Sequence, residues 1–150
     1  MKTTPVLSGR VEALLRSGVP AVLVTVGEDG WGHAAMTWAA AVAPDRVRFV
    51  ADHGSATLAN LERDGKASLQ VIGADNVLAL VKGRVRERRA RIAASPFGMA
   101  MWELHVTEVR DQAWSPVAVS PLAYRWVGPE AGTLSRMEQA VLTELRDPSD

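Results

Sequence analysis

The sequence predicts a mainly β protein, a six-stranded antiparallel barrel with short peripheral helices and a C-terminal helix. The first observation is a series of short β-rich runs joined by tight turns, without the helical crossovers of parallel sheets. The second is that helical periodicity is confined to the two ends of the chain and one short middle segment. Because 150 residues suffice for one domain with a sizeable core, we expect residues 1–150 to form a single domain.

The expected elements follow from apolar periodicity and from the turn residues between the runs. Gly18 and Gly65 lie where helices commonly end, and Asp29-Gly30 between two β-rich runs favours a hairpin. In chain order we expect a helix over residues 6–17, strands over 21–26, 31–42 and 46–51, a short helix after Ser55, strands over 66–72, 77–88 and 99–110, and a helix over 133–146.

Three of these elements have a specific signature. Ser55 is expected to cap the short helix, because its hydroxyl can accept a hydrogen bond from a first-turn amide. The alternation in residues 46–51 places Val47, Phe49 and Ala51 on one face of a strand. The last helix has one apolar stripe, formed by Leu134, Met137, Val141 and Leu145.

Composition excludes several classes of function. The 17 basic and 17 acidic side chains balance to zero, so we expect no nucleic-acid partner. The absence of cysteine excludes disulfides, thiol catalysis and cysteine-ligated metals. No apolar run is long enough for a membrane helix, and the N-terminal residues do not resemble a secretory signal. We therefore expect a cytoplasmic protein with no membrane association.

The neutral total conceals a local excess of positive charge. Residues 82–91 hold six basic side chains and one acidic side chain, a net of +5. In a strand, Lys82, Arg84, Arg86 and Arg88 would share one face, opposite an apolar face. This basic face suits an anionic ligand or a partner subunit, and it is equally consistent with a solvated strand end.

No self-sufficient catalytic motif is present, and we assign no catalytic residue. The histidines His33, His53 and His105 have no metal-ligand spacing, so no metal site is expected. His53 is of interest because it precedes the short helix, although an exposed loop histidine is the simpler interpretation. Of the tryptophans, Trp38 is a candidate for contact with a ring, and we expect the others to serve packing.

Residues 31–85 carry a resemblance to a known family. Its main parts are Gly32-His33-Ala34-Ala35-Met36-Thr37-Trp38, a strand at 47–52, Ser55-Ala56-Thr57 opening a helix, Asn60-Leu61, and Val81-Lys82-Gly83-Arg84-Val85. Together they resemble the FMN-binding split-barrel family, which includes pyridoxamine 5'-phosphate oxidase and reductases that use the deazaflavin F420. The resemblance covers roughly residues 6–110.

The resemblance implies a homodimer of split barrels with two flavin sites at the interface, and an oxidoreductase that transfers hydride to or from a small molecule. Flavin supplies the hydride chemistry in such proteins, and the chain supplies binding and orientation. Hydroxyls and free amides at a helix start suit a phosphate. The implied cofactor-binding residues are Met36, Thr37 and Trp38 along the ring, Val50 and Ala51 beside the ring or ribityl chain, Ser55, Ala56 and Thr57 at the phosphate, and Lys82 and Arg84 on the basic strand.

The chain also departs from the family pattern. It has Ser55-Ala56-Thr57 where the oxidases carry Ser-Arg-Lys, and Ala35 where they carry arginine, so His33, Lys82 or Arg84 would have to supply the positive charge. Pyridoxamine phosphate oxidation is not expected. FMN is the first expectation for the cofactor. Two alternatives are an F420-dependent reductase on the same scaffold, and a non-catalytic ligand-binding or structural dimer that has lost tight cofactor binding.

Overall fold

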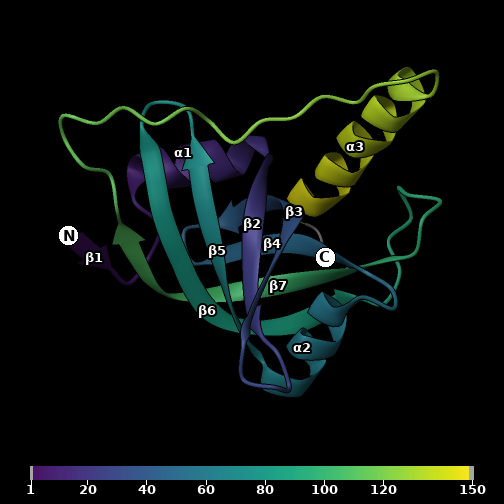
Figure 1. Ribbon diagram of the computed structural model, residues 1–150, viewed down its shortest axis with the longest axis horizontal. Coiled ribbons are helices and arrows are strands. Elements are labelled where there is room, and N and C mark those ends of the chain that lie inside the picture. The colour runs from purple at the N-terminus through teal and green to yellow at the C-terminus, as the bar shows by residue number, and fades with distance from the viewer. Residues whose placement is uncertain (1, 149–150) are drawn as a thin grey trace.

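A computed structural model describes residues 2–148 of the chain, and its strands wrap around one interior with helices on the outside (Figure 1). The expected order of elements is confirmed, with one further strand at the N-terminus. The elements are β1 (Lys2–Thr4), α1 (Gly9–Ser17), β2 (Val19–Val26), β3 (Gly32–Ala43), β4 (Arg46–Asp52), α2 (Ala56–Asp64), β5 (Lys66–Gly73), β6 (Val77–Arg89), β7 (Met99–Asp111) and α3 (Ala131–Arg146).

The strands close into the expected six-stranded antiparallel barrel. Their order is β1-β7-β4-β3-β2-β5-β6. An additional pairing between β6 and β7 closes the barrel. Along one edge β7 pairs first with β4 and then, near its end, with β1. The sequence did not indicate β1, because three residues are too few for an alternating pattern to be visible.

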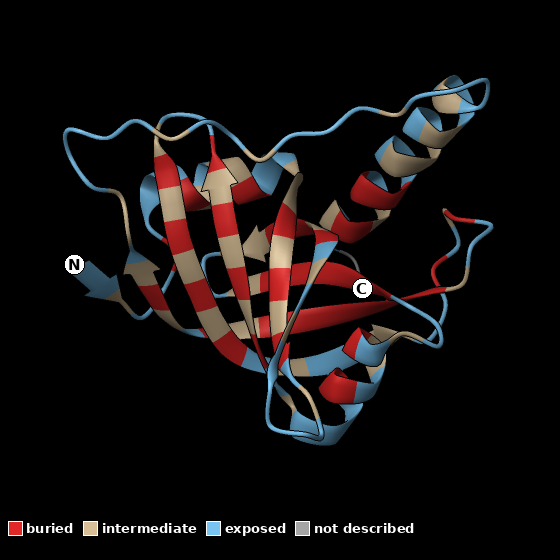
Figure 2. Ribbon diagram, in the orientation of Figure 1, coloured by how far each residue is buried: buried red, intermediate tan, exposed pale blue. Residues whose placement is uncertain are grey.

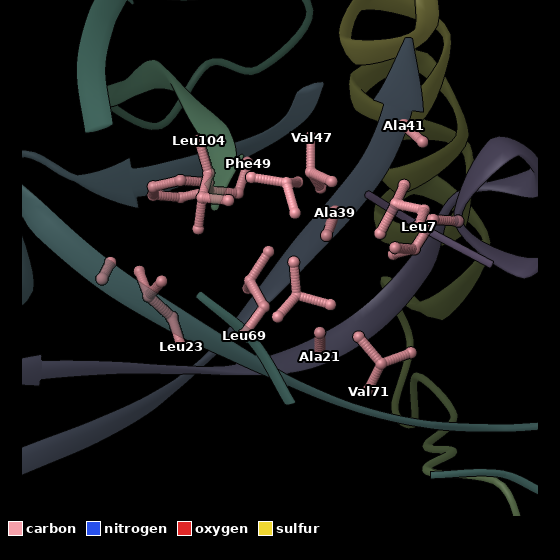
Figure 3. Close-up of a cluster of buried hydrophobic side chains, with 14 of the residues drawn as sticks. Leu7, Ala21, Leu23, Ala39, Ala41, Val47, Phe49, Leu69, Val71 and Leu104 are labelled. Carbon is pink, nitrogen blue, oxygen red and sulfur yellow. The ribbon is translucent and has the colours of Figure 1, made fainter. Parts of the chain in front are cut away.

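Alternation along the strands separates the barrel interior from its outer surface. Figure 2 shows regular bands of buried and half-buried residues on β2, β5 and β6. Inward side chains such as Leu23, Leu69 and Leu104 fill the interior, as Figure 3 shows. β4 departs from a one-sided pattern, because Arg48 and Val50 are buried as well as the expected inward residues Val47, Phe49 and Ala51.

The second buried face of β4 lies beneath α3, which packs against β3 and β4. Val50 and Met101 join Val141, Leu142 and Leu145 of the helix in a second hydrophobic cluster. Met137, Val141 and Leu145 of the predicted apolar stripe therefore face the barrel, and Leu134 lies outside this cluster. Among residues 2–148, no helix is long and apolar enough to cross a membrane.

One buried ion pair lies under the end of α3. Arg48 and Glu103 are both fully buried, and the Arg48 Nε donates to Glu103 Oε2 at 3.0 Å. Arg48 also donates to the Asp147 carbonyl at 2.6 Å, which ties the end of the helix to β4. Burial alone would raise the pKa of Glu103, but the hydrogen bond and charge of Arg48 outweigh it and lower that pKa.

We expect Glu103→Gln to destabilise the protein by about 3–5 kcal/mol, because it removes the buried negative charge that balances the charge of Arg48. Since folding lowers the pKa of Glu103, the wild-type pair contributes stability above the ordinary value of 4.5 and loses it as the pH falls through the folded-state pKa. Urea unfolding from pH 7 to pH 3 measures both effects. Glu108→Gln, which removes an exposed ion pair with Arg110, is the matched control and should change stability far less.

Gly83 allows β6 and β7 to approach closely at a register shift between Lys82 and Gly83. A Cβ at this position would lie 2.0 Å from the His105 carbonyl oxygen, which is backbone and cannot move aside cheaply. We expect Gly83→Ala to lower the free energy of unfolding by about 3 kcal/mol. Gly32→Ala, at a strand position with no atom within 4 Å, should leave stability nearly unchanged in the same urea assay.

Candidate functional site

The barrel is incompletely paired between β3 and β4. β3 pairs with β2 from Gly32 to Ala39, whereas its ladder with β4 runs only between Ala39 and Ala43. Before Ala39, the Thr37 hydroxyl substitutes for the ladder: it donates to the Val50 carbonyl at 2.7 Å and accepts from the Val50 amide at 3.2 Å. The two strands then separate, and the backbone edge of β3 that faces β4 is left open.

A cavity of about 470 Å³ occupies this opening, and we call it the seam pocket. Its size is within the range of small-molecule and cofactor sites. The predicted ring, ribityl and phosphate residues all line it. The lining consists of Leu23, His33, Ala35, Met36, Thr37, Trp38, Val50, Ala51, Asp52, Ser55, Ala56, Thr57, Met99, Tyr124 and Trp126.

One end of the seam pocket is the N-terminus of α2. Ser55 caps this helix as expected, accepting from the Leu58 amide at 3.1 Å while donating its own proton to the Asp52 carbonyl at 2.7 Å. Its donor is therefore already used. By contrast, Thr57 is 6% exposed, and its hydroxyl makes no hydrogen bond to any other group within residues 2–148. Together with the first amides of the helix, it offers neutral donors to an anion.

Two polar contacts hold α2 against β2 and so fix this end of the pocket. The buried Asn60 side chain donates to the Thr25 hydroxyl at 3.0 Å. Arg63 donates to Asn60 Oδ1 at 3.1 Å and also to the Val26 carbonyl. Gly65 ends the helix in the left-handed conformation, as the sequence predicted.

The other end of the pocket is aromatic. The ring centroid of Trp126 lies 6.4 Å from that of Trp38 and 5.9 Å from that of Tyr124. Glu138 of α3 holds the group together: its Oε1 accepts from Trp126 Nε1 at 3.0 Å and from the Tyr124 hydroxyl, which in turn accepts from Trp38 Nε1. Burial and the bond to Glu138 raise the pKa of Tyr124, so the phenol keeps its proton.

Lys82 and Arg84 do not line the seam pocket. They lie with Lys66 along a separate groove whose walls include Val24 and Thr107, and we call these three residues the basic ladder. Lys66 and Arg84 are directly opposite each other on β5 and β6, an arrangement of like charges that is unfavourable by itself, and Asp64 lines the same groove. Lys82 pairs with Glu108 at 3.6 Å.

The remaining basic residues of β6 have structural partners. Arg86 lies 3.5 Å from Glu103, and Arg89 lies 2.6 Å from Glu144 of α3. The alternation predicted for residues 77–85 is confirmed, with the apolar side chains inward. Further along the strand a second register shift, between Glu87 and Arg89, interrupts the expected common face.

The histidines are dispersed. His33 lines the seam pocket, whereas His53 bonds the Ala90 carbonyl at 2.7 Å and lies 3.3 Å from Arg91. His105 contacts Glu103 at 3.0 Å. Within residues 2–148, no cluster of three histidine or carboxylate side chains could hold a metal ion. His33 and Asp52 are the charged or chargeable side chains of the pocket besides Tyr124, and the lining has no lysine or arginine.

Sequence reasoning missed the pocket roles of Tyr124 and Trp126. Both residues belong to the connection between β7 and α3, residues 112–130, which has neither strand nor helix. Trp126 was assigned to packing, and Tyr124 was not singled out. A segment without periodicity gives no signal for the direction of its side chains, although two closely spaced aromatics in one loop are a feature that the sequence shows.

The fold and the pocket define a class: a split barrel with a ligand-sized cavity at its open seam. The sequence model of the pyridoxamine 5'-phosphate oxidase family matches residues 7–118, three quarters of the chain. This chain belongs to that family. No curated protein sequence matches it.

Solved structures agree on the fold. An F420 reductase has a TM-score of 0.59 at 19% identity, over 67% of this chain and 96% of its own. HupZ from Group A Streptococcus has a TM-score of 0.60 at 12% identity, over 76% of this chain and 99% of its own. A candidate pyridoxamine 5'-phosphate oxidase from Lactobacillus delbrueckii has a TM-score of 0.60 at 18% identity, over 73% of this chain and 99% of its own. At these identities the likeness extends to the fold alone.

We expect Thr37→Val to weaken the seam, because it leaves the Val50 amide and carbonyl without their partner. The expected loss is about 1–3 kcal/mol in the free energy of unfolding. The Val50 amide should also exchange its hydrogen faster, which NMR can measure residue by residue. Thr107→Val, at an exposed strand position, is the control and should stay within about 0.5 kcal/mol of the wild type. Unchanged exchange at Val50 in Thr37→Val would contradict this role.

Proposed function

We propose that this protein is an FMN-binding oxidoreductase whose flavin occupies the seam pocket and exchanges hydride with a small molecule. The observation that carries the proposal is the open edge of β3 beside Thr37, with the first amides of α2, those of Ala56 and Thr57, at one end of the same cavity. An unpaired strand edge offers backbone donors and acceptors to a heteroaromatic ring. The α2 terminus offers donors to a phosphate.

The residues of the seam pocket fit a flavin ring beside β3 better than they fit a phosphate at the N-terminus of α2. Met36, Thr37 and Trp38 would border the ring, and Val50 and Ala51 would border the ring or ribityl chain. At the phosphate, Ser55 would act mainly by capping α2. The Thr57 hydroxyl and the first amides of α2, including that of Ala56, would be the donors. When bound, flavin supplies the hydride chemistry, and the chain positions it and limits access of water.

In our proposal the positive charge for the phosphate comes from a second copy, in a homodimer with sites at its interface. Val22, Val24 and Leu80 are half-buried on the outer face of β2, β5 and β6, and no helix lies over that face (Figure 1). Met36, 55% exposed, extends this apolar surface to the seam pocket, and Val26, 47% exposed, extends it to the groove of the basic ladder. Burial of the surface by a second copy would bring the copy's own basic ladder toward the phosphate end, where Lys82 and Arg84 could serve.

A second candidate is an F420-dependent reductase on the same scaffold. The basic ladder favours it, because its three cations outnumber Asp64, the acidic residue in the lining of this groove, and suit a longer anionic tail than a single phosphate. An enzyme of this kind would place the deazaflavin ring in the same seam pocket. The two candidates differ in cofactor and agree on the position of the ring.

The test is titration of the purified protein with FMN and, separately, with F420, followed by tryptophan fluorescence or calorimetry. We expect FMN binding, and we expect Ala56→Glu to weaken it at least tenfold, because a carboxylate beside the phosphate repels it. Ala59→Glu adds the same charge to an exposed position of α2 outside the seam pocket and should bind FMN like the wild type.

Sedimentation and two further variants test the interface. A dimer at micromolar concentration is expected, and Lys82→Gln should weaken FMN binding if the ladder of one copy serves the site of the other. Arg125→Gln, which neutralises an exposed cation outside both cavities, is the control. A wild-type protein that binds neither FMN nor F420 would overturn the enzyme proposal and leave a non-catalytic member of the family.

A further inference from the structure

The connection between β7 and α3 supplies one wall of the seam pocket from outside the barrel. We call residues 112–130 the strap. Figure 1 shows it crossing above one end of the barrel to reach α3. The family match ends at residue 118, so Tyr124 and Trp126 lie beyond the matched residues. This wall is a candidate determinant of the specificity of the pocket.

The strap is held in place along its length, although it has no regular structure. Asn76, at the β5–β6 turn, donates to the Val117 carbonyl at 3.2 Å and accepts from the Val119 amide at 2.8 Å. The Leu122 amide then donates to the Ile72 carbonyl at 2.9 Å. Glu138 holds the last part, through Tyr124 and Trp126. A surface fixed in this way is preorganised for a ligand.

The aromatic wall, formed by Trp38, Tyr124 and Trp126, has a definite electrostatic character. The polar hydrogens of Tyr124 and Trp126 point to the Glu138 carboxylate, and that of Trp38 points to the Tyr124 oxygen. Donation to an anion polarises an aromatic system and makes its face more negative. Such faces attract cations and the positive edges of other rings.

The charged groups near the aromatic wall also favour a cation over an anion. Asp52 lies on the lining, Glu138 lies directly behind the wall, and the lining contributes no lysine or arginine among residues 2–148. The aromatic wall therefore favours binding of a flat apolar ligand and disfavours a negatively charged one.

We propose that the aromatic wall recognises the second ligand of the pocket, the hydride-exchanging substrate, and that this ligand is a planar aromatic molecule without negative charge. The assignment of that ligand as substrate rests on the proposed function. Trp126 and Tyr124 are specificity-determining residues in this proposal, and Glu138 is a positioning residue that also sets the charge preference. No phosphorylated or carboxylated ring would be favoured at this end.

The test uses three probes that share a fused, planar two-ring core: N-methylquinolinium, quinoline and naphthalene-2-sulfonate, which are cationic, neutral and anionic at neutral pH. Each is titrated by calorimetry into the full-length protein, with and without saturating FMN. We expect the cation to bind about tenfold more tightly than the anion, with quinoline between them, and we expect this order to persist with FMN present.

Variants separate the wall from general effects on folding. Trp126→Ala should weaken N-methylquinolinium binding about tenfold and leave the FMN affinity unchanged. Trp114→Ala is the matched control, because Trp114 is on the same strap, is 70% exposed and does not line the pocket. Glu138→Gln keeps an acceptor oxygen for Tyr124 and Trp126 but removes the charge, so it should reduce the preference for cation over anion.

Each outcome bears on one proposal. Equal affinity for the three probes, or a charge preference unaltered in Glu138→Gln, overturns this inference while FMN binding stands. Displacement of the probes by FMN, with a weaker FMN affinity in Trp126→Ala, shows that the wall holds the cofactor ring and also overturns it. Probe selectivity in a protein that binds neither FMN nor F420 supports the recognition surface and removes the proposed function.

Discussion

The site depends on an interruption of the β3–β4 ladder. A closed barrel pairs every strand edge, and a ligand cannot reach backbone groups that are already bonded. Here the ladder with β4 ends at Ala39, and Thr37 supplies two last bonds to Val50 through its side chain. One hydroxyl thus ends the pairing without leaving the buried Val50 groups unsatisfied. The residues that follow toward the β2–β3 turn are free to border a cavity while β2 still holds them in register.

The two walls of the opening are built by different means. At one end, α2 is a local element with its own start and stop, and Asn60 ties it to β2. At the other end, the aromatic wall depends on α3, whose position depends in turn on the hydrophobic contact with β4 and on Arg48. Glu144 extends this dependence, since it accepts from the Ala93 and Ala94 amides and so holds the β6–β7 connection. α3 therefore supports the pocket from outside the barrel.

This difference explains what the sequence could predict. The six barrel strands, the Ser55 cap and the Gly65 terminator are local or periodic signals, and the sequence predicts all of them to within a few residues. The three-residue strand β1 gives no such signal. The pocket residues on β3, β4 and α2 came from the family resemblance. The role of Thr37 at the seam could not be derived, because it depends on the partner strand stopping short. Tyr124 and Trp126 were missed since their placement is set by Glu138, Asn76 and other residues distant in sequence.

The separation of charge within the chain also has a thermodynamic consequence. The total of zero combines a pocket that carries Asp52 and no cation with a basic ladder on a different surface. A single copy can offer a phosphate only neutral donors, which are weaker than charge-assisted ones. If a second copy supplies the ladder, cofactor binding and association must strengthen each other by the same factor, because linkage is reciprocal. Apparent cofactor affinity would then rise with protein concentration, whereas affinity for an uncharged ring at the aromatic wall would not.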